Sequence, residues 1–320
     1  MKPTDLSELA DHIRRSPQFQ QKRIIAPTLG GAGFRAAAMG FVNGDDAAAI
    51  PDGDGFLLLA AEAITPSLVR RDPFLAGRSA VLANVNDIYS MGGRPVAIVD
   101  VILAEDTGTS AEIFRGVADF SMRLQVPVVG GHTTVAEGPP SVSLAILGKA
   151  ARLITSFDAR PGDRMALVYN SDGEWLEDLG FWNSLPGRTG AEHVADLELL
   201  PMAAESGLVR AGRDVSMCGI AGTALMLLEA SRVGARVELE RITIPEGVHP
   251  GRWLLAYFSY GFILAVGDKQ WNDVVDLFGA RSLQVLQIGT FLSGSQLILS
   301  AGGRQEVLWD WSAKPFLGFR

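Results

Sequence analysis

The chain is poor in the residues that build disulfide frameworks, metal knuckles and nucleic-acid surfaces. Its 320 residues include one cysteine, Cys218, which excludes an intrachain disulfide framework and a Cys-rich metal knuckle. Basic side chains number 28 against 36 acidic ones, giving a formal net charge of −8, and no Lys/Arg cluster stands out. We therefore expect neither nucleic acid nor an anionic membrane as a partner.

Targeting segments and long apolar runs are also missing. The first ten residues have neither the basic segment nor the apolar core of a secretory signal. The longest apolar stretches, at 56–61 and 96–103, are too short or too interrupted to span a bilayer. We expect a soluble, cytoplasmic protein.

Common catalytic motifs are absent as well. The sequence has no GxxxxGK[ST] loop, no HExxH, no GxSxG and no GxGxxG placed after a strand. An ordinary P-loop enzyme, zincin, serine hydrolase or Rossmann dehydrogenase is therefore not supported.

Helical and strand patterns alternate along the chain. Apolar residues make up 48 % and charged residues 20 %, enough for a large core, and the length favours two domains. The apolar patterns predict an amphipathic opening helix, strands at 56–63, 95–103, 126–129, 141–150, 165–169, 236–239, 262–266, 284–288, 296–299 and 306–309, and helices at 75–91, 110–124, 195–204, 219–231 and 271–278. We predict an α+β fold of mixed α/β layers. Turn residues around 158–163 place the domain boundary between residues 157 and 158, and residues 170–190 have no readable pattern.

Two groups of carboxylates lie beside predicted strands. Asp45 and Asp46 are adjacent, after Gly44 and before an apolar strand, where like charges favour water or a cation such as Mg²⁺. An Asx turn that starts the strand is the alternative. Glu62 ends a continuous apolar run and is either a rim carboxylate with a partner or an ordinary surface acid.

Two further segments carry polar residues in apolar surroundings. Asn84 and Asp87 are three residues apart within a predicted helix and share one face, which is either functional or simply solvated. Gly130 and Gly131 follow a predicted strand, and a loop there could bring the backbone close to a phosphate. His132 next to them is either part of that site or a hydrogen-bonded structural histidine.

Two further segments are candidates for binding an anion. One precedes a helix in the carboxy-terminal half, and the other is a basic loop in the amino-terminal half. Asp214 and Ser216 precede the helix at 219–231, where they could cap it or help to bind an anion at its amino terminus. Cys218 has no evident base nearby in sequence and is not expected to be a nucleophile. Arg70 and Arg71 lie in a predicted loop, where they could bind an anionic substrate, remain solvated, or pair with a neighbouring acid such as Asp72.

The order and spacing of these segments resemble the aminoimidazole ribonucleotide (AIR) synthetase superfamily. The matching segments are Gly44-Asp45-Asp46-Ala47, Ala61-Glu62, Asn84-x-Asn86-Asp87-Ile88-x-x-Met91-Gly92-Gly93-x-Pro95, Gly130-Gly131-His132-Thr133, Arg160-Pro161-Gly162-Asp163, Asp214-x-Ser216 and Leu228-Glu229-Ala230-Ser231-x-x-Gly234-Ala235. The superfamily includes thiamine-monophosphate kinase, selenophosphate synthetase and the hydrogenase-maturation carbamoyl dehydratase. The resemblance covers about residues 25–300 and is closest to the uncharacterised AIR synthase-related branch.

This resemblance implies an ATP-binding, Mg²⁺-dependent homodimer. It implies an amino-terminal domain (1–157) whose strands join a barrel shared across the dimer, and a carboxy-terminal α+β domain (158–320). The residues that it implies as metal ligands are Asp45, Asp46, Glu62, Asp87, His132 and Asp214. Those that it implies near the nucleotide are Gly44, Asn84, Gly130, Gly131, Thr133 and Ser216, with Arg70 and Arg71 near the substrate.

The sequence departs from the known members at several positions. Glu62 stands where relatives have Asp, His132 stands at the Asp position of GGD as in selenophosphate synthetase, and Met217 replaces the second acid of the kinase's D-x-S-D. We expect an ATP-dependent phosphoryl-transfer enzyme, or an ATP-driven ligase or dehydratase, with a small, anionic acceptor. The alternatives are a non-catalytic nucleotide-binding or scaffold protein of the same fold, and a divalent-metal hydrolase that does not use ATP.

Overall fold

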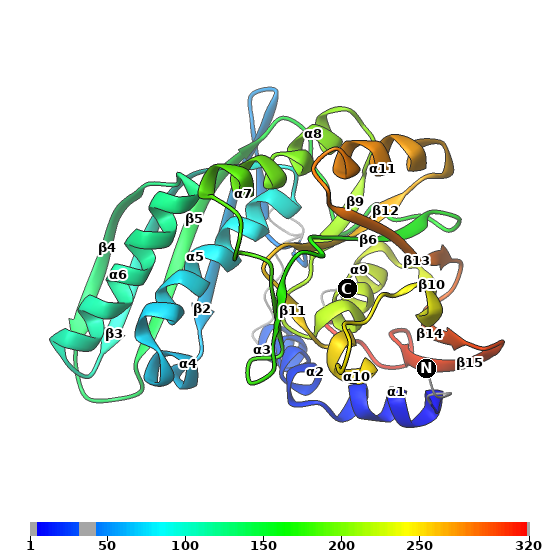
Figure 1. The fold of residues 1–320 in the computed structure, drawn as a ribbon, viewed down its shortest axis with the longest axis horizontal. Coiled ribbons are helices and arrows are strands. Elements are labelled where there is room, and N and C mark those ends of the chain that lie inside the picture. Colours follow the sequence, from blue (N-terminus) through cyan, green and yellow to red (C-terminus); the bar gives the residue numbers. More distant parts are fainter. Residues whose placement is uncertain (1–4, 32–42, 319–320) are drawn as a thin grey trace. The chain divides into compact units, whose positions relative to one another are not determined.

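The computed structural model describes residues 5–31 and 43–318 and divides them into two compact units (Figure 1). The larger unit contains the described residues up to Asp45, residues 154–186 and residues 206–318. The smaller unit contains residues 46–153 and 187–205. The predicted boundary at 157/158 lies close to the crossing at 153/154. The chain also passes between the units at 45/46, 186/187 and 205/206. These crossings could not be predicted, because they depend on contacts between residues distant in sequence.

The smaller unit is a five-stranded sheet in the order β1-β2-β5-β3-β4. Its strands are β1 (Ala48–Asp52), β2 (Gly55–Ile64), β3 (Arg94–Ala104), β4 (Val128–Val135) and β5 (Ser141–Ala150). Only β3 and β4 pair in parallel. Its helices are α4 (Pro66–Arg71), α5 (Pro73–Ser90), α6 (Thr107–Leu124), α7 (Gly190–Leu197) and α8 (Leu199–Glu205). Helices α5 and α6 pack side by side on one face of the sheet (Figure 1).

The covered and open faces of this sheet follow the two-residue period of its strands. On β3, Ile98 and Ile102 are fully buried beneath the helices, whereas Val99, Val101 and Leu103 are 40–46 % exposed. Leu59 of β2 is 48 % exposed. The unit by itself therefore leaves one apolar sheet face uncovered.

Local signals and close packing define helix α5. Asp72 caps its start by accepting a hydrogen bond from the Leu75 amide at 2.8 Å, and Pro73 occupies the first helical position. Gly116 of α6 allows the two helices to touch, because a Cβ there would lie 2.1 Å from the Phe74 carbonyl oxygen. The cap and this close contact fix the start of α5 against α6.

The larger unit contains a seven-stranded sheet in the order β15-β14-β10-β13-β6-β12-β9 and a short sheet in the order β11-β8-β7. The strands of the first are β6 (Arg164–Tyr169), β9 (Ala211–Asp214), β10 (Gly234–Glu238), β12 (Gly261–Val266), β13 (Gln284–Leu292), β14 (Gln296–Ala301) and β15 (Arg304–Asp310). Those of the second are β7 (Glu174–Leu176), β8 (Phe181–Asn183) and β11 (Tyr257–Phe258). The helices are α1 (Leu6–Arg15), α2 (Pro17–Lys22), α3 (Ile25–Gly31), α9 (Gly219–Ser231), α10 (Pro250–Leu254) and α11 (Trp271–Gly279), with 3₁₀ turns η2 (Leu239–Arg241) and η3 (Asp268–Gln270).

The two ends of the described chain meet in the larger unit. Helix α1 packs against β14 and β15, and the Arg14 Nε donates to the Leu308 carbonyl oxygen at 3.2 Å. The buried carboxylate of Glu229 on α9 accepts hydrogen bonds from three consecutive backbone amides, of residues 316, 317 and 318, at 2.8–2.9 Å. These contacts tie the amino-terminal helix and the carboxy-terminal segment to one core.

Four predicted segments differ from the structure. The predicted loop after β2 contains helix α4, and the predicted loop at Gly130 and Gly131 is the middle of strand β4. The predicted helix at 195–204 is two helices, because Pro201 in the first turn of α8 cannot continue α7. The unreadable segment 170–190 contains β7 and β8. Among the described residues, no helix is both long and apolar enough to cross a bilayer.

Candidate metal and nucleotide site

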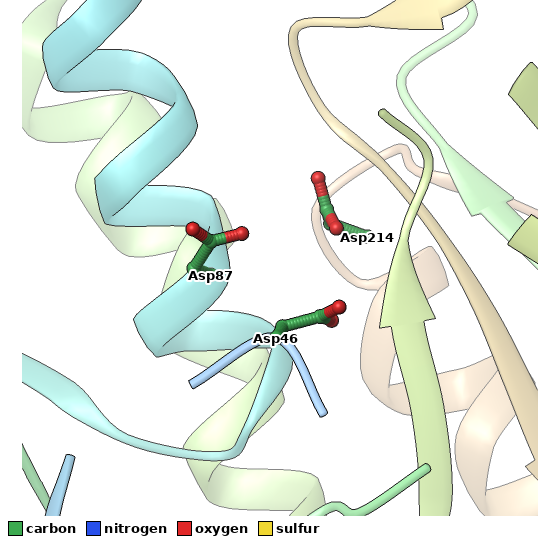
Figure 2. Close-up of side chains that lie close together, drawn as sticks. All are labelled: Asp46, Asp87 and Asp214. Carbon is green, nitrogen blue, oxygen red and sulfur yellow. The ribbon is translucent and has the colours of Figure 1, made fainter. Parts of the chain in front are cut away.

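Two carboxylates of the smaller unit form the centre of the candidate site. Asp46 lies just before β1, and Asp87 lies near the end of α5, almost fully buried (Figure 2). A carboxylate oxygen of each lies within 4.8 Å of the other. The Ser90 hydroxyl, one turn after Asp87, lies 2.8 Å from Asp46 Oδ2 and 2.8 Å from the Asp87 carbonyl oxygen, and so orients Asp46.

Helix α5 presents a buried polar stripe that ends at this pair. Asn84, Asp87 and Ser90 are spaced by three residues and all are buried, which excludes the solvated helix face that the sequence left open. Asn84 Nδ2 donates to the Ala80 carbonyl oxygen at 2.9 Å, but Asn84 Oδ1 has no hydrogen-bond partner within the described part of the chain. A buried carbonyl oxygen without a donor is costly and is available to a ligand.

These donors fit a hard divalent cation. Carboxylate, amide and hydroxyl oxygens are the ligands that Mg²⁺ prefers, and one oxygen each of Asp46 and Asp87 lies within 4.8 Å of the other. A cation between Asp46 and Asp87 would offset their mutual repulsion.

Asp214 is the last residue of β9 in the larger unit, and it is also drawn in Figure 2. Its side chain is buried, and its carbonyl oxygen accepts a hydrogen bond from Thr223 Oγ1 at 3.2 Å. The N-cap of α9 is Cys218, so the sequence alternative in which Asp214 or Ser216 caps this helix is wrong. Burial raises the pKa of the Cys218 thiol to about 12, in agreement with its expected lack of nucleophilic function.

Asp45 has surroundings different from those of Asp46. Its carboxylate accepts hydrogen bonds from the Ser156 amide at 3.1 Å and from the Ser156 hydroxyl at 2.6 Å, within the larger unit. Gly44 before it has a φ of +116°, which favours glycine. The two adjacent acids of the sequence motif are thus directed to different groups, and this pairing is not the local Asx turn.

The structure does not bring Glu62 to the aspartate pair. Leu58 on β2 pairs with Gly148, and a Cβ at Gly148 would lie 2.5 Å from an Ile88 side-chain carbon, so the Asp87 end of α5 lies over this row. Glu62 is four residues further along β2 than Leu58, and it is not one of the acids grouped with Asp46 and Asp87. It is exposed at the end of β2.

His132 lies on the open face of the sheet. It pairs with Val101, and its Nε2 is 3.0 Å from Thr134 Oγ1. Because side chains alternate along a strand, Gly131 faces the other side, where a Cβ would lie 2.2 Å from Asp100 Oδ1. Gly131 therefore makes room for the buried carboxylate of Asp100, and burial raises the pKa of this carboxyl group. His132, on the opposite face, points away from α5 and Asp87.

The two arginines lie on α4. Arg70 is exposed and pairs with Glu105 at 3.3 Å, while Asp72, the alternative partner suggested by the sequence, caps α5. Arg71 is also exposed. Within the described chain, Gly130 and Thr133 lie on the exposed edge strand β4, and Ser216 lies in the loop between β9 and α9.

Two family models match this sequence. The model described as "AIR synthase related protein, N-terminal domain" matches residues 44–150, and that described as "AIR synthase related protein, C-terminal domain" matches residues 191–301. The resemblance read from the sequence is confirmed. The two-domain fold of mixed α/β layers is also confirmed.

Relatives extend over most of the chain. An uncharacterized protein of Synechocystis sp., sll0787, is 44 % identical over 277 residues, covering 86 % of each chain. The selenide, water dikinase of Clostridioides difficile is 27 % identical over 220 residues, covering 65 % of this chain and 62 % of its own. By its name, this second relative is an enzyme.

Solved structures share the fold. Thermotoga maritima PurL complexed with ADP superposes with a TM-score of 0.72 at 17 % identity, over 85 % of this chain and 46 % of PurL. AaThiL complexed with AMPPCP and TMP has a TM-score of 0.66 at 18 % identity, over 88 % of this chain and 93 % of AaThiL. The chain thus spans about half of PurL and nearly all of AaThiL.

Proposed function

We propose that this chain, which belongs to the AIR synthase-related family, is an ATP- and Mg²⁺-dependent enzyme acting on a small anionic acceptor. It would transfer the terminal phosphoryl group of ATP to the acceptor, or release it after activating the acceptor. The observation that carries the proposal is the pair of carboxylates, Asp46 and Asp87, held within 4.8 Å beside the unpaired oxygen of Asn84. Solved structures of the same fold, PurL and AaThiL, were obtained with ADP and AMPPCP, which supports a nucleotide as the ligand.

In this proposal Asp46 and Asp87 hold Mg²⁺, and Asp214 keeps the metal-ligand function that the family resemblance implies for it. When bound, the cation neutralises the triphosphate and positions its terminal phosphoryl group. Ser90 fixes the Asp46 carboxylate through its hydroxyl. Ser216, two residues after Asp214, and the strand residues Gly130, Gly131 and Thr133 would contact the nucleotide. We leave Glu62, His132 and Asp45 out of this ligand set.

We propose that the arginines of α4 bind an anionic group of the acceptor that is distant from the transferred phosphoryl group, because α4 precedes the start of α5 and Asp87 lies near the end of that helix. Two guanidinium groups can bind a carboxylate or phosphate through paired hydrogen bonds. Arg70 is 56 % exposed and its partner Glu105 is 52 % exposed, so an anionic acceptor can replace Glu105 at little cost. Arg70→Ala and Arg71→Ala should therefore reduce acceptor-stimulated turnover, while the affinity for Mg·ATP stays within about twofold. Turnover equal to that of the parent in both variants would refute this assignment.

The open sheet face is proposed as the interface of a homodimer. Leu59 on β2 and Val99, Val101 and Leu103 on β3 expose apolar side chains on the same face, on the two strands that flank β5, and a second copy could cover them. Light scattering should give about twice 34.1 kDa for the parent chain. Val101→Glu should shift this mass towards the monomer. Met122→Glu on α6, where the side chain is 75 % exposed, should leave it unchanged.

Calorimetry and an ADP-release assay together test the proposed function. We expect ATP to bind with Mg²⁺ and to bind much more weakly with EDTA, and we expect one class of small anion to raise ADP release above background. Mg·ATP binding without turnover for any acceptor class would favour the non-catalytic alternative, to which Met217 in place of an acid lends some support. Binding of the metal combined with no detectable binding of ATP, even when Mg²⁺ is present, would indicate a metal hydrolase and refute the proposal.

A further inference from the structure

A buried polar network joins two segments of the larger unit that are distant in sequence. Arg213 Nη1 donates to the Ser156 hydroxyl at 2.8 Å and to the Gly44 carbonyl oxygen at 2.7 Å. The Ser156 hydroxyl in turn donates to Asp45 Oδ1 at 2.6 Å, and the Ser156 amide donates to the same carboxylate. Ser156 is fully buried and Arg213 is nearly so.

The network is anchored in the core of this unit. The Ser156 carbonyl oxygen accepts a hydrogen bond from Ser231 Oγ at 2.7 Å, at the end of α9. Arg213 lies on β9, which pairs with β12. The opposite charges of Asp45 and Arg213 both contact the Ser156 hydroxyl, so each offsets the cost of burying the other.

The charged residues of this network lie next to proposed metal ligands in the sequence. Asp45 immediately precedes Asp46, and Arg213 immediately precedes Asp214, so the two charged members of the network are chain neighbours of proposed metal ligands. The strand at Arg213 and the turn at Gly44 and Asp45 are bound to one serine. Movement of either segment would break charge-assisted hydrogen bonds in a buried setting.

We propose that Asp45, Ser156 and Arg213 are positioning residues that fix the two backbone segments from which Asp46 and Asp214 project. Asp45, the first acid of the Asp-Asp motif, then acts through Ser156 and does not bind the metal. This inference rests on the proposed function, since it needs the carboxylates to bind a cation. It gives the two adjacent acids separate functions, one structural and one as a ligand.

For Arg213→Ala, the proposal predicts a change in Mn²⁺ affinity opposite in sign to the change expected from electrostatics alone. Removing a cationic side chain beside a metal site should tighten the binding of a cation, because a repulsion is lost. Arg213→Ala should instead weaken Mn²⁺ binding by at least tenfold, because the β9 and Gly44 segments lose their common anchor. Arg210→Ala is the matched control. It removes a half-exposed arginine three residues earlier that pairs with Asp163, and Mn²⁺ affinity should be unchanged or slightly higher.

A second variant separates positioning from ligation at Asp45. Asp45→Asn keeps an oxygen that can accept from the Ser156 hydroxyl, so Mn²⁺ affinity should stay within about threefold of the parent. If Asp45 were a ligand, loss of its charge would weaken binding as strongly as Asp87→Asn. Ser156→Ala should reproduce the Arg213→Ala loss, and the double variant should be no worse than either single one.

Mn²⁺ titration followed by electron paramagnetic resonance, with Mn²⁺ alone as the probe, measures these affinities without any need for turnover. Circular dichroism confirms that each variant is folded, and Asp45→Asn tests the idea even if Arg213→Ala does not fold. Parent-like or tighter binding by Arg213→Ala, or a tenfold loss in Asp45→Asn, overturns the positioning inference alone. Failure of the parent to bind Mn²⁺, with or without ATP, overturns the proposed function and this inference with it.

Discussion

Replacing Asp87 with Asn should have opposite effects on stability and on metal binding. In the absence of metal, Asp46 and Asp87 repel each other at a separation within 4.8 Å. Coulomb's law gives about 1 kcal/mol for this repulsion with water-like screening and about 3.5 kcal/mol with the screening typical near a protein surface. Because Asp46 is partly exposed, we expect Asp87→Asn to stabilise the metal-free protein by about 1–2 kcal/mol.

Mg²⁺ should reduce the stability advantage of Asp87→Asn over the parent. A tenfold weaker affinity corresponds to about 1.4 kcal/mol. When the cation is present at about one hundred times its dissociation constant, it stabilises the parent by about 2.7 kcal/mol and a tenfold weaker variant by only about 1.4 kcal/mol. The stability advantage of Asp87→Asn measured in EDTA should therefore shrink by about 1.3 kcal/mol in saturating Mg²⁺.

Denaturant unfolding in EDTA and in Mg²⁺, together with calorimetry of Mg·ATP binding, measures both effects. The control is Asp54→Asn, which removes an exposed charge from the turn between β1 and β2 of the same unit and should change neither quantity. Unchanged Mg·ATP binding in a folded Asp87→Asn variant would rule out the metal assignment. An unchanged or lower stability in EDTA would show that the two carboxylates do not strain the apo protein.

Three further predictions concern the scaffold. Glu229→Gln should cost about 2 kcal/mol in unfolding free energy, because an amide cannot accept all three backbone hydrogen bonds of the carboxylate. Gly116→Ala should cost about 2 kcal/mol or more, because the new Cβ would overlap the Phe74 carbonyl oxygen. Burial, with the Arg123 and Arg188 charges, lowers the pKa of His193 to about 4, so the unfolded chain binds a proton first as the pH falls. Stability should therefore drop between pH about 6.5 and about 4, by on the order of 3 kcal/mol, as measured by urea unfolding.

Each of these predictions has a control. Glu246→Gln removes an exposed carboxylate and should leave stability unchanged. Gly279→Ala, where a Cβ would meet nothing within 4 Å, should be neutral or stabilising by up to about 1 kcal/mol. His193→Gln should flatten the pH dependence between about 4 and 6.5, and an unchanged slope would mean that other groups carry it.

The long apolar elements could be predicted from the sequence because their signals are local. The strands β2, β3 and β5 and the helices α5 and α6 were predicted to within a few residues from apolar runs and helical spacing. The family followed from the order of short motifs. The polar stripe of α5 could be recognised from the sequence as Asn and Asp in an otherwise apolar helix. The structure shows that these residues are buried, so they are not a solvated helix face.

The features that were missed depend on partners distant in sequence. Gly131 looked like a loop glycine, but it is required because Asp100, some thirty residues earlier, occupies the space of its side chain. Strand β9 was not predicted, because four buried residues give no period, although it positions Asp214. The partner of Asp45 is Ser156, 111 residues away, and no local pattern distinguishes it from a metal ligand.

The meeting of the two chain ends has a consequence for synthesis on the ribosome. Arg14 binds the Leu308 carbonyl oxygen, a partner 294 residues later, and the apolar side chains of Leu9 and Ile13 are buried in the same core. At about 5–20 residues per second, the first helix waits roughly 15–60 s before the strand that covers it has been translated. Throughout that interval the apolar stripe of α1 lacks its partners on β14 and β15. Slowed translation of the segment that encodes β14 and β15 should therefore lower the yield of folded protein more than slowing within the segment that encodes β2 to β5.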